Sequence, residues 1–135
     1  MSKTASQTEK PVFTGCRPVL PVADIAASVT YYCDALGFEV GWGWPDPENP
    51  EYEGEDSTLV YVFRGHFELL LESCDGPIYP MKIVVGMPST DAVDVLAAEY
   101  QDSGAKIVEP PELRVWGTYE MLVLDLDGHR LRMLH

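Results

Sequence analysis

Apolar residues follow two different spacings along this chain, and both spacings occur twice. Between Asp24, a predicted helix N-cap, and Gly37, a predicted C-cap, they recur every three or four positions, at Ile25, Val29, Tyr32 and Leu36. This spacing places them on one face of a helix. A second helical stripe ends at Gly104 and consists of Val93, Leu96, Ala97 and Tyr100.

Shorter apolar runs predict strands on either side of these helices. In the first half the runs are Phe13–Val22, Phe38–Trp44, Leu59–Arg64 and Phe67–Glu72. In the second half they are Met81–Met87, Lys106–Glu109, Tyr119–Leu124 and Arg130–Leu134. Hairpins are predicted across Gly65-His66 and across Asp127-Gly128, and Pro110-Pro111 is expected to end the strand before it.

The two halves repeat one another at a constant offset. Three pairs of residues that mark the ends of strands and helices lie 67 positions apart: Pro21 and Pro88, Asp24 and Asp91, and Gly37 and Gly104. Each half therefore predicts the order strand, helix, strand, strand, strand. The predicted fold class is α+β, with two tandem βαβββ modules, about residues 13–76 and 77–135. Their curved mixed sheets surround a cleft, and the helices lie outside. The polar residues 1–12 are expected to form a disordered tail.

The composition narrows the classes of partner. The chain has 135 residues, 46% of them hydrophobic, which fits one globular domain. Its net charge of −13 would repel a phosphate backbone, so we expect no nucleic acid partner. The same charge either attracts a cationic ligand or serves solubility alone. We expect no membrane segment, because no apolar run reaches roughly 20 residues. Three cysteines without a CxxC pair indicate a reduced, cytoplasmic protein.

Two stretches carry a more specific pattern. The first runs from Arg17-Pro-Val-Leu-Pro-Val-Ala-Asp to Tyr31-Tyr-Cys-Asp-Ala-Leu-Gly-Phe, and the second from Val115-Trp-Gly to Leu124-Asp-Leu-Asp-Gly-His. They resemble the vicinal-oxygen-chelate superfamily of glyoxalases, dioxygenases and bleomycin-resistance proteins, and in particular its bleomycin-resistance branch. The resemblance covers residues 13–135. It implies a homodimer with two clefts at or near the interface, whose modules pair either within one chain or by exchange between chains.

The metal-binding positions of that superfamily hold unsuitable residues here. Metal-dependent members take a His, Glu or Gln ligand from the first and last strands of each module. By position, these places fall on Arg17, Glu68, Lys82 and Arg132. Arginine has no lone pair to donate, and lysine donates one only when its pKa is strongly depressed. His66 and His129 lie at predicted turns, where histidines are usually solvated. We therefore expect no metal and no other cofactor.

Strand alternation assigns candidate ligand contacts to the face that lines the cleft. There Glu68 and Arg132 are predicted to face one another as an ion pair, which either anchors a ligand or fills the place of the metal. The aromatic residues of these strands either contact a ligand or pack in the hydrophobic core. The predicted ligand-binding residues are Trp42, Trp44, Tyr61, Phe63, Glu68, Leu70, Trp116, Tyr119 and Arg132. The acidic loop of residues 45–56 either steers the ligand or is simply solvated.

Two functions remain open at this point. In the first, the protein resembles bleomycin-resistance proteins and sequesters an aromatic or cationic small molecule, a drug or a metabolite, without a metal. In the second, it is a lyase, isomerase or oxygenase that acts on a small oxygenated substrate, with Glu68 as a lone general base. The sequence contains no GxSxG elbow, phosphate loop or HExxH helix. We favour the binding protein and assign no catalytic residue.

Overall fold

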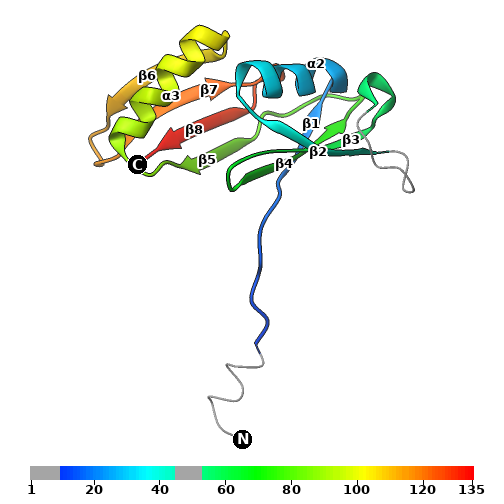
Figure 1. Cartoon of the computed structure of the whole chain (residues 1–135), viewed down its shortest axis with the longest axis horizontal. Helices are drawn as coiled ribbons and strands as arrows, with labels where there is room; N and C mark the ends of the chain where they lie inside the picture. Colours follow the sequence, from blue (N-terminus) through cyan, green and yellow to red (C-terminus); the bar gives the residue numbers. More distant parts are fainter. Residues whose placement is uncertain (1–9, 45–52) are drawn as a thin grey trace, which may run out of the picture.

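The protein consists of two four-stranded mixed sheets, each with helical residues on one face (Figure 1). A computed structural model describes residues 10–44 and 53–135. The predicted α+β class with two βαβββ modules is confirmed, and the sheets stay open. Residues 1–9 of the predicted tail and residues 45–52 of the predicted acidic loop lie outside the described residues.

Module 1 has the strand order β1-β4-β3-β2, with β1 parallel to β4 and the other neighbours antiparallel. Its elements are β1 (Val19–Val22), α2 (Ile25–Thr30), η1 (Tyr31–Ala35), β2 (Glu39–Trp44), η2 (Gly54–Asp56), β3 (Leu59–Arg64) and β4 (Phe67–Ser73). Asp24 caps α2 as predicted, since its carboxylate accepts a 3.0 Å hydrogen bond from the Ala27 amide. The helix widens into a π-helical turn at η1 before Gly37, whose φ is 77°.

The prediction that β1 begins at Phe13 is wrong. The strand begins at Val19, because only Val19–Val22 have a partner strand, β4. Residues 10–18 form a mostly exposed arm on the side of the sheets away from the helices (Figure 1). Phe13 is 96% exposed on that arm. An apolar strand pattern therefore predicted pairing where none of the strands in the described residues lies alongside.

Module 2 has the equivalent order β5-β8-β7-β6. Its elements are β5 (Lys82–Gly86), α3 (Thr90–Ser103), β6 (Lys106–Leu113), β7 (Tyr119–Leu124) and β8 (Arg130–Leu134). Pro110-Pro111 does not end β6 as predicted. The strand continues because β6 lies at the sheet edge and the prolines fall within an irregular register between Glu109 and Glu112.

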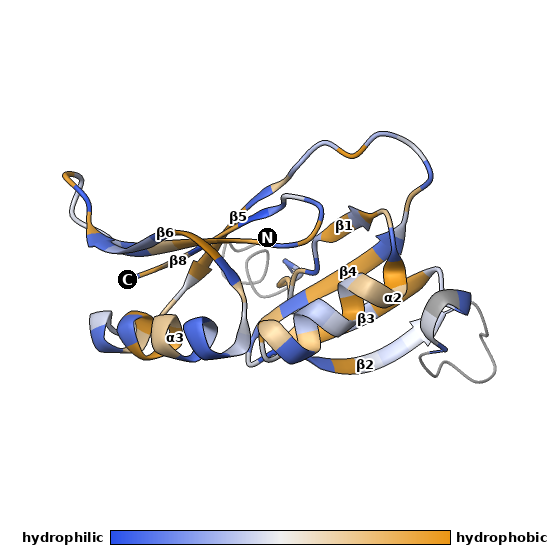
Figure 2. Cartoon of the chain, turned by 90° about the horizontal axis from the view of Figure 1, so that it is seen from above, coloured by the Kyte–Doolittle hydropathy of each residue, from blue (hydrophilic) through white to orange (hydrophobic). Residues whose placement is uncertain are grey.

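The helices and the covered sheet faces enclose one core that both modules share. Figure 2 shows apolar residues of β3, β4 and α2 where the helix lies against the sheet. The strands contribute alternate residues to this core, namely Val60, Val62, Leu69, Leu71, Met121, Val123, Leu131 and Met133. None of the described helices is long and apolar enough to cross a membrane.

His129 lies at the junction of the modules, and the expectation that this turn histidine is solvated is wrong. It is fully buried, because the turn between β7 and β8 packs against module 1. Its Nδ1 accepts a 2.9 Å hydrogen bond from the Met81 amide. The proton therefore sits on Nε2, which donates to the Pro21 carbonyl of β1 at 2.7 Å. Within this chain, the modules are fixed side by side.

Candidate functional site

The face of each sheet away from the helices is the candidate ligand surface. In module 1, the residues between the core positions of β3 and β4 point to this face. The register pairs Trp42 with Tyr61 and Trp44 with Leu59 on neighbouring strands. We define the aromatic face by the residues that this pairing brings together: Trp42, Trp44, Leu59, Tyr61, Phe63, Glu68 and Leu70. Six of the predicted ligand-binding residues lie on it.

Three rings form a row across the aromatic face. The ring centroids of Trp42 and Tyr61 are 5.7 Å apart with an interplanar angle of 41°. Tyr61 and Phe63 are stacked, with centroids 5.6 Å apart and an angle of 27°. The guanidinium carbon of Arg17 lies 4.4 Å from the Tyr61 ring centroid, a cation–π distance. Trp44 extends the apolar surface and is 41% exposed.

Glu68 is held at the edge of this row by two donors. The Tyr61 hydroxyl donates to its Oε2, and Arg17 Nε donates to the same oxygen at 3.3 Å. The Tyr61 hydrogen bond and the Arg17 charge hold the pKa of Glu68 below its usual range, and the same hydrogen bond raises the pKa of Tyr61. Glu68 is therefore a paired carboxylate of reduced basicity, which is a poor match for a lone general base.

A bulge in β2 brings Trp42 to the aromatic face. Simple alternation would place Val40 and Trp42 on one side of the strand, but the register shifts between them. Val40 consequently lies opposite the core residue Val62, whereas Trp42 lies opposite Tyr61. Gly41 permits this close packing, since a Cβ there would lie 2.3 Å from the Tyr61 ring.

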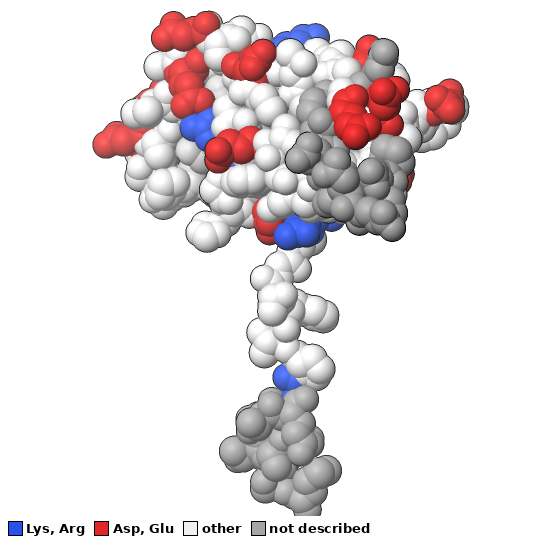
Figure 3. Space-filling view, turned by 45° about the vertical axis from the view of Figure 1, so that its right-hand side comes forward, with Lys and Arg blue, Asp and Glu red and all other residues white. Residues whose placement is uncertain are grey.

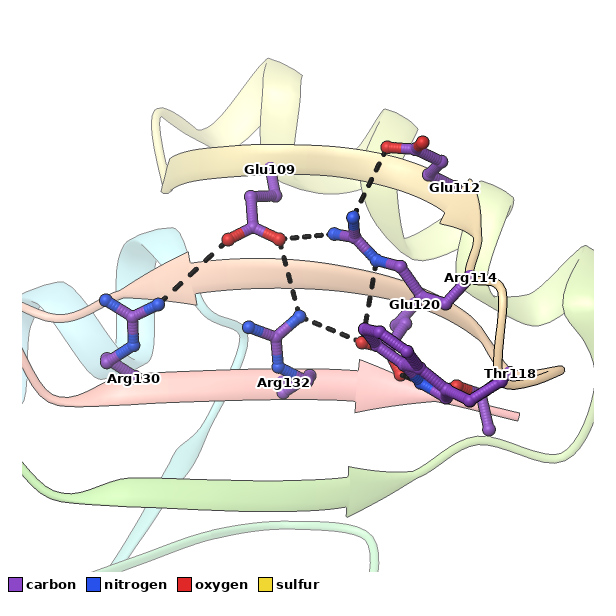
Figure 4. A network of polar contacts seen from close by, with 8 residues as sticks. Glu109, Glu112, Arg114, Thr118, Glu120, Arg130 and Arg132 are labelled. Atoms are coloured by element: carbon purple, nitrogen blue, oxygen red, sulfur yellow. Dashed lines mark hydrogen bonds and ion pairs between the residues drawn. The ribbon is translucent and has the colours of Figure 1, made fainter.

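The same face of module 2 is ionic instead of aromatic (Figure 4). We define the ionic face by its charged residues: Lys82, Glu109, Glu112, Arg114, Glu120, Arg130 and Arg132. Arg132 Nη1 donates to Glu120 at 2.9 Å and to Glu109 at 3.4 Å. Arg114 also donates to Glu109, and the Arg130 guanidinium lies 4.0 Å from it. Beneath these groups, Leu122 is 1% exposed.

Glu120 is the buried anchor of the ionic face. Its side chain is 2% exposed, and its Oε2 accepts from Thr118 at 2.6 Å and from Trp116 Nε1 at 3.3 Å. Burial opposes its ionisation, but these two hydrogen bonds and the Arg132 guanidinium outweigh that effect and keep the pKa of Glu120 below its usual range. The carboxylate is thus charged and fixed in place.

The two modules carry bulges at equivalent positions. In β6 the register shifts between Ile107 and Glu109, 67 residues after the shift between Val40 and Trp42. Glu109 thereby lies opposite Leu122, on the uncovered face, instead of continuing the core side of Ile107. Glu109 is consequently the counterpart of Trp42, and an equivalent bulge exposes an aromatic ring in one module and a carboxylate in the other.

The strand register also changes which residue of β4 is equivalent to which residue of β8. In module 1, Trp42, Tyr61 and Leu70 lie opposite one another on neighbouring strands. In module 2, Glu109, Leu122 and Arg132 do the same. Arg132 therefore corresponds to Leu70, and the counterpart of Glu68 is Arg130.

The predicted ion pair between Glu68 and Arg132 does not form within the chain. Glu68 is paired with Arg17, and Arg132 with Glu120 and Glu109, because the two residues lie on separate sheets. Tyr119 does not lie on the ligand face where it was predicted. It packs against the core instead, and its hydroxyl donates to Asp94 of α3. It lies on the helix side of its sheet.

Trp116 is 67% exposed beside the ionic face, and its indole contacts Glu120. It is therefore separated from the aromatic residues of module 1, on the other sheet. The sequence indicated only Lys82 and Arg132 of the ionic face. Alternation alone does not reveal the bulge that turns Glu109 outward, and Arg114 lies after a strand that was expected to end earlier.

The residues at the metal positions do not fit a divalent ion. Three of the four positions hold cations: Arg17, Lys82 and an arginine of β8. That arginine is Arg132 by sequence position and Arg130 by strand register. The fourth residue, Glu68, is already paired with Arg17. Among the described residues, no three His, Cys, Asp or Glu side chains gather in a group that could hold a metal. Cationic side chains at ligand positions would repel the ion and offer no lone pair.

Comparison with known families agrees with this architecture. Residues 16–133 match the model of the Glyoxalase/Bleomycin resistance protein/Dioxygenase superfamily. The chain belongs to this superfamily. Among curated proteins, none has a significantly similar sequence. The resemblance to the superfamily is thus confirmed over nearly all of the chain, whereas the bleomycin-resistance branch stays a prediction.

Several solved structures share this fold at low sequence identity. TioX from Micromonospora sp. ML1 is similar with a TM-score of 0.70 and 21% identity, covering 90% of this chain and 98% of its own. A lactoylglutathione lyase from Agrobacterium tumefaciens is similar with a TM-score of 0.68 and 17% identity, covering 93% of this chain and 95% of its own. At such low sequence identity, the structural similarity establishes only the common fold, and the function has to be argued from the site.

Proposed function

We propose that the protein binds a small molecule with a flat aromatic group on the aromatic face, without a catalytic metal. The row formed by Trp42, Tyr61 and Phe63 carries this proposal, because it lies on a sheet face that none of the described helices covers. A planar ligand would stack on these rings, with Leu70 and Leu59 beside them. The paired Arg17 and Glu68 at its edge supply polar contacts that fix its orientation.

The aromatic contacts are large enough to support binding. Burial of one aromatic side chain covers about 150 Å², which at about 25 cal/mol per Å² gives roughly 4 kcal/mol before costs. Two or three such contacts support an affinity near micromolar, about −8 kcal/mol, after the loss of translational and rotational freedom. An exposed ion pair contributes only about 0–1 kcal/mol. The rings therefore supply most of the free energy of binding.

A positive charge on the ligand would speed its arrival. The chain carries a net charge of −13, and acidic side chains outnumber basic ones on the face shown in Figure 3. Such a surface attracts cations over roughly a Debye length, about 8 Å at physiological ionic strength. The charge of Glu68 is largely neutralised by Arg17, so the surface as a whole attracts the ligand.

A second copy of the chain would complete the cleft. The aromatic face leaves Trp44 41% exposed. A homodimer that covers this face would enclose the ligand, and we propose sequestration by such a dimer as the cellular role. Three free cysteines are consistent with a reducing cytoplasm.

The test is calorimetric titration of chelator-treated protein with two aromatic probes, metal-free bleomycin and the planar cation proflavine. We expect at least one to bind near micromolar, and Trp42→Leu to weaken that binding roughly tenfold, or about 1.4 kcal/mol. Val95→Ser is the matched control, since Val95 is 68% exposed on α3, which packs on the sheet of module 2. Binding that requires added metal would instead favour an enzyme of this superfamily.

A further inference from the structure

Basic residues are concentrated on the ionic face of an otherwise acidic protein. Four of the chain's nine lysines and arginines lie there: Lys82, Arg114, Arg130 and Arg132. They face three carboxylates, those of Glu109, Glu112 and Glu120, so this face carries one positive charge in excess. The chain as a whole carries −13. This local reversal of charge has no role in stacking an aromatic ligand on the other sheet.

Glu109 occupies the centre of these guanidinium groups (Figure 4). Its Oε1 contacts Arg114 and lies 3.4 Å from Arg132, while its Oε2 lies 4.0 Å from Arg130. One carboxylate thus bridges three arginines that come from two different parts of the chain. A carboxylate from a ligand would meet the same donors, because arginine binds such groups through paired N–H bonds.

The two inner carboxylates differ in how firmly they are held. Glu120 is 2% exposed and accepts hydrogen bonds from Thr118, Trp116 and Arg132. Glu109 is 37% exposed and has only arginine partners among the described residues, two of them at 3.4 Å or more. It also projects from a bulge on the edge strand β6. Glu109 is therefore the carboxylate that can move away.

Arg130 and Arg132 keep donors available for an incoming group. Their side chains are 40% and 27% exposed. Within the described part of the chain, Arg132 donates only through Nη1, and Arg130 makes one contact, at the long distance of 4.0 Å. Lys82 lies beside Arg130 on the neighbouring strand β5 and adds a third cation at the exposed edge.

We propose that the ionic face binds a carboxylate group of a small molecule at Arg130 and Arg132, and that Glu109 holds this place as an internal counter-ion that the ligand displaces. The site lies on the other sheet from the aromatic face and stands independently of the ligand proposed there. The acidic surface opposes long-range approach of an anion. Contact at the guanidinium groups dominates once salt screens that repulsion beyond about 8 Å.

The test uses succinate as the probe and the full-length protein at constant ionic strength. Succinate has no ring, so it does not report on the aromatic face. The indole N–H signals of the three tryptophans are followed by NMR. Trp116 contacts Glu120 beside the proposed site, whereas Trp42 and Trp44 lie on the other sheet. We expect saturable movement of the Trp116 signal, little change of the other two, and no effect of the neutral analogue succinamide.

Glu109→Gln gives the decisive comparison, since it removes the competing charge. We expect it to bind succinate at least tenfold more tightly than the unmodified protein, a gain that misfolding does not mimic. Arg132→Gln should abolish the movement of the Trp116 signal. Asp102→Asn is the matched control and should leave the affinity unchanged, because Asp102 is exposed on α3, outside the ionic face. A Glu109→Gln affinity within twofold of the original, or equal effects of succinamide, would overturn the proposal.

Discussion

The Tyr32 hydroxyl donates a 2.7 Å hydrogen bond to the carboxylate of Asp125, 93 residues further along the chain. Both side chains are buried, and the bond joins the helical segment of module 1 to the turn that follows β7 in module 2. Asp125 also accepts from the amides of Asp127 and His129. Burial nevertheless raises the pKa of Asp125, because these donors compensate only part of its lost hydration.

The first prediction concerns the pH dependence of this contact. A raised folded-state pKa means that the folded protein binds more protons than the unfolded chain, so Asp125 lowers the stability as pH rises from its ordinary pKa through its folded value. The Tyr32 hydrogen bond favours the charged carboxylate. Tyr32→Phe should therefore raise the pKa of Asp125 further and cost about 1–3 kcal/mol of unfolding free energy at pH 7.

The cost of Tyr32→Phe should shrink in acid, where Asp125 is protonated in both proteins. Urea denaturation at a series of pH values measures both effects. Tyr79→Phe is the control, because Tyr79 is 78% exposed, and should change the stability little at any pH. A loss that is equal at pH 7 and in acid below the ordinary pKa of aspartate would contradict a role through the charge of Asp125.

The second prediction concerns His129, whose Nε2 bonds the Pro21 carbonyl and whose Nδ1 bonds the Met81 amide. His129→Ala removes both hydrogen bonds and leaves a buried gap, so the free energy of unfolding should fall by roughly 2–4 kcal/mol. His66→Ala, at an exposed turn, should stay within about 0.5 kcal/mol. Chemical denaturation of both variants provides the comparison. Similar small losses would show that His129 does not hold the modules together.

Local sequence signals predicted most of the fold, because caps and turns depend on nearby residues. Asp24 caps its helix and Gly104 ends the second one as expected, and β7 and β8 have the predicted bounds. The errors concern strand pairing. Phe13 lies in the first part of an apolar run, for which the described residues offer no partner strand, and Pro110 continues an edge strand in which its missing N–H is tolerated.

The candidate site was predictable only where alternation is regular. Tyr61 and Phe63 are two residues apart on β3 and share the aromatic face as predicted. The bulge before Glu109 depends on how β6 pairs with β7, and nothing in the alternation of apolar and polar residues indicates it. Tyr119 was assigned to the wrong side, because the choice between two faces of a strand requires knowledge of where the helix packs.

The third prediction tests the bulge in β2. Gly41→Ala would place a Cβ about 2.3 Å from the Tyr61 ring, so the ring or the strand has to move. We expect a loss of about 1–3 kcal/mol of stability, together with displacement of Tyr61 from Arg17. Gly86→Ala in β5 is the matched control, since nothing lies within 4 Å of its added Cβ. Thermal unfolding and the aromatic region of the NMR spectrum distinguish the two variants.

The last prediction concerns the ionisation of Glu68. The Tyr61 hydroxyl is the largest cause of its lowered pKa, followed by the opposing effect of burial and then by Arg17. Tyr61→Phe should therefore shift the pKa of Glu68 upward, toward its ordinary value, while Arg17 keeps part of the depression. NMR titration of the glutamate side-chain carbons measures the shift. Tyr119→Phe removes a comparable hydrogen bond in module 2 and should leave Glu68 unchanged.

The sign of the effect on stability follows from the same pKa. Because the folded-state pKa of Glu68 is depressed, its contribution to stability is present above its ordinary pKa and is lost as pH falls through the folded value. Tyr61→Phe should thus make the unfolding free energy less sensitive to acid over that interval. An unchanged Glu68 titration in Tyr61→Phe would mean that Arg17 alone sets the charge of this carboxylate, and that the tyrosine serves only as a ring in the aromatic row.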